Sequence, residues 1–152
     1  MRLLTVCALM LLVALPAGIP VAAEAEEPVE QALGRFIEAF NALDWDTFRR
    51  SFADDVSVFN PQIPEARVLA RLDGKDSVEA SFRGVFDAAR RSGAGPHIVP
   101  RNVRVQSLTD AAVVTFEFDR GSGSFGRRTL VFARQPDGWK IIHVHASNVS
   151  PQ

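Results

Sequence analysis

Two of the three histidines in this chain of 152 residues lie one residue apart. His143 and His145 belong to the stretch Asp137–Ser147, which has the pattern of a strand, and side chains alternate between the two faces of a strand. Both imidazoles should therefore point the same way. A neutral imidazole can donate or accept a hydrogen bond, bind a metal ion or move a proton near neutral pH. His143 and His145 are therefore the candidate catalytic residues.

The preceding strand supplies neighbours for both histidines if its hairpin closes without a bulge. Pairing across Gln135–Gly138 then puts Arg128 opposite His145 and Leu130 opposite His143. Directly opposed side chains lie about 4.5–5.5 Å apart at Cβ, which is close enough for hydrogen bonds. Arg128 and Leu130 are therefore predicted to share a ligand-binding face with the two histidines.

A third strand extends this row by one carboxylate. Pairing across Gly121–Ser124 without a bulge puts Glu117 opposite Arg128, so that Glu117, Arg128 and His145 form a row. In the functional interpretation the row lines a pocket, and Glu117 or Arg128 sets the pKa of a histidine that acts as an acid or a base. In the structural interpretation Glu117 and Arg128 form an ordinary cross-strand ion pair, and His145 packs beside it.

Metal binding is a third interpretation of the same histidines. Two histidines one residue apart on a strand can chelate a metal ion, with Glu117 or His97 as a further ligand. A catalytic zinc ion usually has three protein ligands, and His97 lies in a segment of uncertain direction next to Gly95 and Pro96. We therefore expect neither a metal site nor a cofactor.

Three amphipathic helices are expected ahead of these strands. Asp44 can cap the second of them, because its carboxylate can accept a hydrogen bond from the first turn. Trp45 and Phe48 fall at helical spacing and read first as core residues, although such rings can also wall an apolar pocket. The apolar spacing predicts helices over Val29–Leu43, over Trp45–Phe52 and between Gly74 and Gly93.

The strand pattern begins between the second and third helices. Asp54–Asp55 is predicted to turn the chain, and Val56–Phe59 to form a short strand that Asn60–Pro61 ends, because proline lacks a donor for the ladder. Val68–Leu72 can return as its partner. Four longer strands follow at about His97–Gln106, Ala111–Arg120, Phe125–Arg134 and Trp139–Val149.

Helices that precede a run of antiparallel strands predict an α+β fold, in which three N-terminal helices pack on one side of a curved antiparallel sheet. Such a sheet, partly closed around a helix, forms a cone with an open mouth. Open mouths of this kind are common sites for small molecules.

The first residues have the pattern of a secretory signal peptide. An apolar run follows Arg2, and Pro16, Gly18 and Pro20 interrupt it before it is long enough for a stable membrane anchor. We expect residues 1–23 to be removed, leaving one domain over residues 24–152 in the periplasm or outside the cell. The net charge is −1 with no basic stripe, which disfavours nucleic acid as a partner.

Four segments carry a resemblance that spans about residues 28–150: Phe36–Asp44, Phe52–Val56, Gly74–Asp76 and Gly138–Ser147. In order and spacing the chain resembles the nuclear-transport-factor-2-like superfamily, also described as cystatin-like. That superfamily includes SnoaL-like polyketide cyclases, ketosteroid isomerases and the association domain of calcium/calmodulin-dependent protein kinase II. The last strand is most similar to that of the association domain. The resemblance implies a single SnoaL-like domain with a cone-shaped cavity.

The resemblance does not bring a known active site with it. Ketosteroid isomerases keep an aspartate base before the proline that follows the first strand, and the matching position here is Asn60, whose carboxamide cannot take a proton. These isomerases also use a tyrosine, and this chain has none. The pocket arginines of the association domain match Glu117 and Leu130, so the anion-binding role of that pocket does not carry over.

Together these features predict an exported domain that binds a small, largely apolar molecule in its cone, with acid–base chemistry at His143 or His145 left open. The predicted binding residues are Asn60, Glu117, Arg128, Leu130, Trp45 and Phe48. The alternative is an oligomerisation module, and in either case we expect a homodimer or a higher homo-oligomer. The predicted assembly face consists of Val114, Phe116, Phe118, Val131, Ile142 and Val144.

Overall fold

The computed structural model describes residues 27–60 and 71–150. The predicted signal peptide lies outside the described residues, as does most of the predicted strand Val68–Leu72. Across the described ranges, no helix is both long and apolar enough to cross a membrane.

The three predicted helices are present, but the first two end two residues earlier than predicted, and Phe52 begins a strand. The second helix begins after Asp44, whose Oδ1 accepts a hydrogen bond from the Thr47 backbone N–H at 3.1 Å. The third ends at Gly93, which adopts a left-handed φ of 69° that a glycine tolerates without strain. The helices are α1 (Val29–Asn41), α2 (Trp45–Arg50) and α3 (Lys75–Ser92).

In the described part of the chain, six strands form one sheet in the order β2-β1-β6-β5-β4-β3. Neighbouring strands run antiparallel except β1 and β6, which run parallel. The described strands are β1 (Phe52–Phe59), β2 (Arg71–Asp73), β3 (Arg101–Ser107), β4 (Ala111–Gly121), β5 (Ser124–Gln135) and β6 (Gly138–Val149).

The predicted turn at Asp54–Asp55 is wrong. Strand β1 continues through both residues, and its pairing with β6 shifts register between Phe52 and Ser57. Because of this irregularity two consecutive carboxylates are exposed without breaking the strand.

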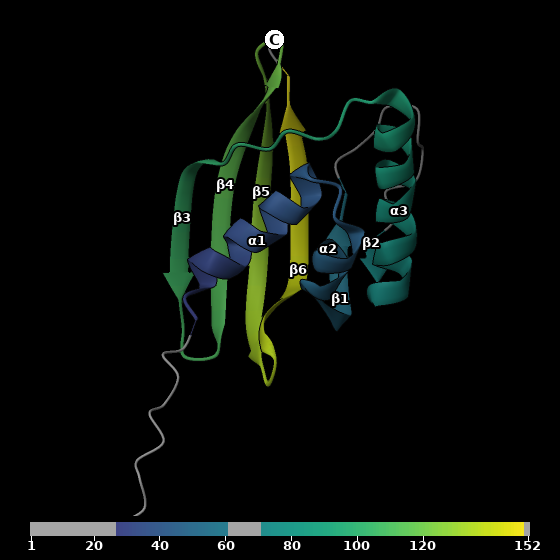
Figure 1. The fold of residues 1–152 in the computed structure, drawn as a ribbon. Coiled ribbons are helices and arrows are strands. Elements are labelled where there is room, and N and C mark those ends of the chain that lie inside the picture. The colour runs from purple at the N-terminus through teal and green to yellow at the C-terminus, as the bar shows by residue number, and fades with distance from the viewer. Residues whose placement is uncertain (1–26, 61–70, 151–152) are drawn as a thin grey trace, which may run out of the picture.

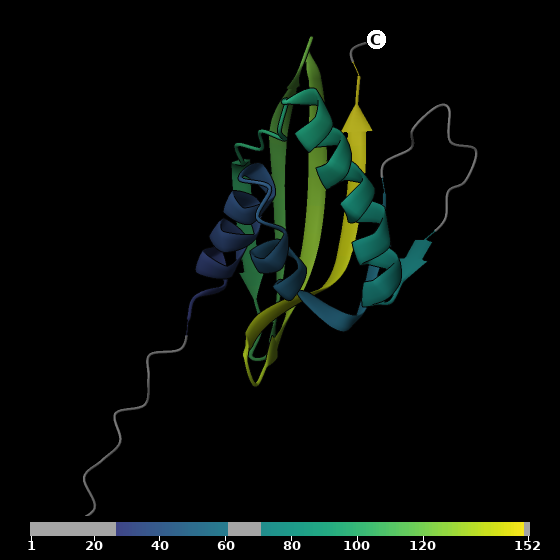
Figure 2. The same ribbon diagram turned by 45° about the vertical axis from the view of Figure 1, so that its right-hand side comes forward.

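Helices α1, α2 and α3 all lie on the same side of the curved sheet, and no described helix covers its other side (Figures 1 and 2). This confirms the α+β fold expected from the sequence. We call the side that faces the helices the inner face and the opposite side the outer face.

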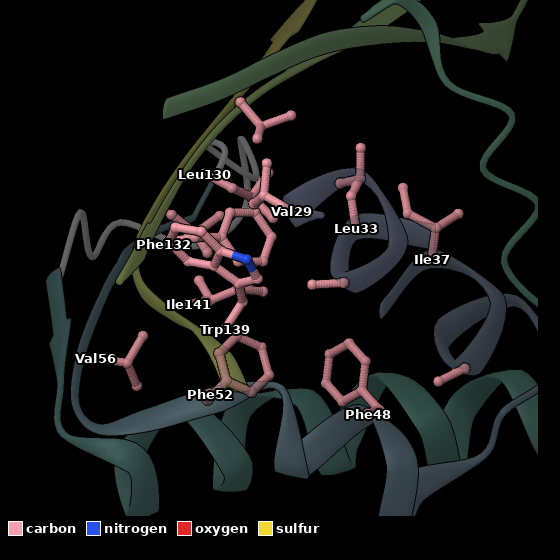
Figure 3. Close-up of a cluster of buried hydrophobic side chains, with 14 of the residues drawn as sticks. Val29, Leu33, Ile37, Phe48, Phe52, Val56, Leu130, Phe132, Trp139 and Ile141 are labelled. Carbon is pink, nitrogen blue, oxygen red and sulfur yellow. The ribbon is translucent and has the colours of Figure 1, made fainter. Parts of the chain in front are cut away.

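The core fills the space between the helices and the inner face. Val29, Leu33 and Ile37 of α1 belong to the same buried cluster as Leu130 and Phe132 of the sheet (Figure 3). Below them Phe48 is the centre of an aromatic cluster. Its ring centroid lies 5.0–5.3 Å from those of Phe36, Phe40, Phe52, Phe82 and Phe86.

Replacing Phe52 with alanine tests this core. Phe52 is 1% exposed and its ring contacts those of Phe36, Phe48 and Phe82, so the truncation leaves a cavity among aromatic rings. We expect Phe52→Ala to lower the free energy of unfolding by about 3–5 kcal/mol in a urea titration. The matched control is Phe125→Ala, because Phe125 is 41% exposed. The control should change stability by no more than about 0.5 kcal/mol, and equal losses in the two variants would contradict the placement of the core.

Candidate functional site

A cavity of about 280 Å³ lies between the helices and the inner face of the sheet. Among the described residues that line it, Asn60, Ser81 and Arg128 are polar and the other eleven are apolar. The helices contribute Phe36, Ile37, Phe40, Phe48, Ser81, Phe82 and Val85 to its wall. The sheet and its flanking segments contribute Asn60, Ile98, Phe116, Arg128, Leu130, Val144 and Ala146.

An extra residue in β6 decides which of its side chains reach this cavity. Phe132 pairs with Ile141 and Val131 pairs with His143, so Ile142 has no partner in β5. One inserted residue reverses the faces of all that follow it. Val144 and Ala146 therefore face inward and are buried, whereas the predicted regular strand would turn them outward.

The prediction that His143 and His145 line the pocket beside Arg128 and Leu130 is therefore wrong. Arg128 pairs with Ala146 and Leu130 pairs with Val144, while His143 and His145 lie on the outer face. The expectation that the two histidines share one face is correct, because both follow the extra residue.

The hairpin between β4 and β5 also differs from the predicted register. Asp119 pairs with Phe125 and Glu117 pairs with Arg127, one position away from the regular closure. This shift puts Glu117 on the outer face, opposite Arg127 and not opposite Arg128. The predicted row of Glu117, Arg128 and His145 is therefore absent.

Glu117 instead belongs to a polar cluster on the outer face. Its Oε2 accepts a hydrogen bond from Asn102 Nδ2 at 3.1 Å, and its Oε1 accepts one from Arg127 Nε at 3.0 Å. Both hydrogen bonds hold the pKa of the Glu117 carboxyl below its ordinary value, and the one from Asn102 has the larger effect. Glu117 is thus engaged outside the cavity.

The histidines lie beside β1 on the same outer face. Ser57 Oγ and His143 Nδ1 are joined by a hydrogen bond of 2.8 Å, and the Phe59 ring centroid lies 5.8 Å from that of His143 and 5.9 Å from that of His145. No carboxylate of the described segments is hydrogen-bonded to either imidazole. Within those segments there is also no group of three or more His, Cys, Asp or Glu side chains placed to hold a metal ion.

Arg128 is the only cation in the cavity wall formed by the described residues. It is half-buried, its Cζ lies 4.8 Å from the ring centroid of Phe118, and it forms no ion pair with a carboxylate in the described part of the chain. Burial, together with the positive charge of Arg120, lowers the pKa of Arg128 to about 10, so the side chain is still charged at neutral pH.

Asn60, Leu130 and Phe48 also line the cavity, as expected for binding residues, whereas Trp45 does not. Trp45 packs against the rings of Phe48 and Phe86 at centroid distances of 6.2 and 5.2 Å. Sequence reasoning missed several lining residues, and the helical periodicity that places some of them on the core face was the available signal. The missed residues include Phe36, Phe40, Ser81, Phe82 and Ala146.

The predicted assembly face is wrong in most of its members. Val114, Phe116, Phe118 and Val144 are all buried on the inner face, because the same register shifts turn them toward the helices. Only Val131 and Ile142 of that set are half-buried outside this core. An apolar assembly surface made of all six residues therefore does not exist in this fold.

Thiol labelling can test which residues of β6 face outward and which face inward. In a Cys7→Ser background, we expect His145→Cys to react rapidly with a maleimide, because position 145 is exposed on the outer face. Val144→Cys is the matched control, since Val144 is 6% exposed and should be strongly protected. Mass spectrometry over a time course measures both rates. Faster labelling at position 144 than at position 145 would contradict the register of β6.

Comparison with known proteins identifies a family and solved structures that are similar to this chain. A family model described as a SnoaL-like domain matches residues 29–151. A candidate dehydratase of the NTF2-like family from Streptomyces avermitilis is 26% identical, with 81% of this chain and 94% of that chain covered and a TM-score of 0.67. No curated protein matches the chain.

Two further solved structures share the fold at lower identity. An NTF2-like protein of unknown function from Pseudomonas putida KT2440 is 21% identical, with a TM-score of 0.63, and the match covers 78% of this chain and 82% of that one. A candidate calcium/calmodulin-dependent protein kinase type II association domain from Thiobacillus denitrificans is 24% identical, with a TM-score of 0.64 over 84% of this chain and 100% of that one.

Proposed function

Because this chain belongs to the SnoaL-like domain family of the NTF2-like superfamily, we propose that it binds a small, largely apolar molecule in the cavity under its helices. Membership of a fold family does not choose a ligand, so the proposal rests on the cavity itself. The observation that carries it is a cavity between helices and sheet whose described wall is apolar except at Asn60, Ser81 and Arg128.

The size and the lining of the cavity favour a compact ligand. Ligand pockets usually measure about 300–1,000 Å³, and a volume of about 280 Å³ lies just below that range. Rings of Phe36, Phe40, Phe48, Phe82 and Phe116 form much of the wall. Aromatic walls offer large apolar contact areas, so an aromatic or short aliphatic body would be well accommodated.

Binding is better supported than acid–base catalysis at this site. None of the described residues lining the cavity is a histidine, aspartate or glutamate, and a carboxamide at Asn60 cannot act as a base. His143 and His145 lie on the opposite face of the sheet. Chemistry at these imidazoles would therefore act on a different molecule from the one in the cavity.

Export and self-association are further parts of the proposal. Export is supported by the signal-like pattern of residues 1–23. We propose the outer face of the sheet as the contact surface of a homodimer or larger homo-oligomer, because no described helix covers it (Figure 2). The proposed binding needs neither of them.

Filling the cavity tests the proposed binding. Ala146 is buried in the cavity wall, so Ala146→Phe should occupy the space and weaken binding of the neutral fluorescent probe N-phenyl-1-naphthylamine by at least about tenfold in a fluorescence titration, which corresponds to about 1.4 kcal/mol. The control is Ser147→Phe, which adds the same ring on the outer face and should leave the affinity unchanged. Absence of saturable binding to the unmodified protein, or equal binding by both variants, would contradict the proposal.

A further inference from the structure

We propose that the ligand of this cavity carries a carboxylate group and that the guanidinium of Arg128 binds it. This inference rests on the proposed function, because it assigns a chemical class to the molecule in the same cavity. It starts from the single charged side chain in the described wall, which lies among apolar and aromatic residues.

The hydrogen bonds of Arg128 leave one edge of its guanidinium available. Nη1 donates to the backbone oxygens of Arg127 at 2.8 Å and Ser147 at 3.1 Å. A guanidinium has five N–H donors, and those on Nε and Nη2 make no hydrogen bond within the described residues. Nε and Nη2 form the fork that binds a carboxylate through two parallel hydrogen bonds.

Within residues 27–60 and 71–150, no carboxylate forms an ion pair with Arg128, so an anionic ligand would supply the counter-charge. The side chain is half-buried beside Phe118 and pairs across the sheet with Phe116, so it has lost part of its hydration. A buried charge is costly unless it is paired. Glu117 of the neighbouring strand β4 is already bound by Asn102 and Arg127 on the outer face.

A second polar group lies in the same row of the sheet. Phe59 pairs with His145, so the next residue, Asn60, lies beside Ala146, which in turn pairs with Arg128. Asn60 lines the cavity, and its amide Nδ2 donates one long hydrogen bond of 3.5 Å to Ser81 Oγ within the described residues. Arg128 and Asn60 thus mark one polar end of the cavity, and the apolar body of the ligand would extend from it toward the aromatic rings.

The number of donors favours a carboxylate over a phosphate. A phosphate monoester carries a charge of about −1.5 to −2 at neutral pH and has three strong acceptor oxygens. Among the described lining residues, Arg128 provides the one positive charge and the one fork. One positive charge and one fork match the charge and the two oxygens of a single carboxylate. They would leave part of the negative charge of a phosphate unneutralised.

Calorimetric titration with matched probes tests the assignment. We would use octanoate, 4-phenylbutanoate and 2-naphthoate, each with its primary amide, its alcohol and the phosphate ester of that alcohol, at pH 7.5. At least one carboxylate should bind at least about tenfold more tightly than its amide and alcohol, which is the range expected for a charge-assisted hydrogen-bonded pair. Arg128→Met should remove that preference and leave the affinity for the alcohol within about twofold.

Two further variants keep the result interpretable. Arg128→Lys preserves the charge but not the fork, and it should bind the carboxylate with intermediate affinity, which also covers the case in which Arg128→Met fails to fold. Arg127→Met removes a neighbouring arginine that faces outward and pairs with Glu117, so it should leave the affinities unchanged.

The outcomes separate this inference from the function on which it rests. If carboxylates and alcohols bind equally and Ala146→Phe weakens both, the cavity binds apolar molecules and the carboxylate assignment is wrong. Tighter binding of a phosphate ester than of the matching carboxylate also overturns the assignment. If no probe of any class binds the unmodified protein, the proposed function itself fails.

Discussion

Strand β6 contains one residue without a partner, and the cavity depends on it. Trp139 and Ile141 precede this residue, Ile142, and pack against the helices, whereas Val144 and Ala146 follow it and line the cavity. All four can face inward only because the ladder has an extra position between them. In a regular strand the positions of Val144 and Ala146 would belong to His143 and His145, and two imidazoles would then need polar partners under the helices.

The same constraint separates the chemistry of the two faces. Inside, the described residues offer aromatic and aliphatic contacts with one cation at the row of Arg128 and Asn60, which suits recognition of a small molecule. Outside, His143 is hydrogen-bonded to Ser57 and lies beside Phe59, where solvent can reach the neighbouring His145. The residues most suggestive of catalysis are therefore not the residues that enclose a ligand.

Local patterns in the sequence predict the elements well, and long-range register poorly. The spacing of Val29, Leu33 and Ile37 reports a helix face that is in fact buried, and Asp44 caps the helix as expected. Ile141 and Ile142 are both apolar, so nothing in their types shows which one is left unpaired. The residue type of Arg128 and its place in a strand were enough to predict it as a binding residue. The residues that pair with it in β4 and β6 depend on two register shifts, which the amino-acid types do not reveal.

Backbone nuclear Overhauser effects across β5 and β6 measure this central constraint directly. The structure predicts contacts that join Val131 to His143 and Phe132 to Ile141, with none that pair Ile142 with a residue of β5. Contacts that instead join Val131 to Ile142 and Leu130 to His143 would show a regular strand. That result would return the histidines to the inner face and contradict the account of the cavity given above.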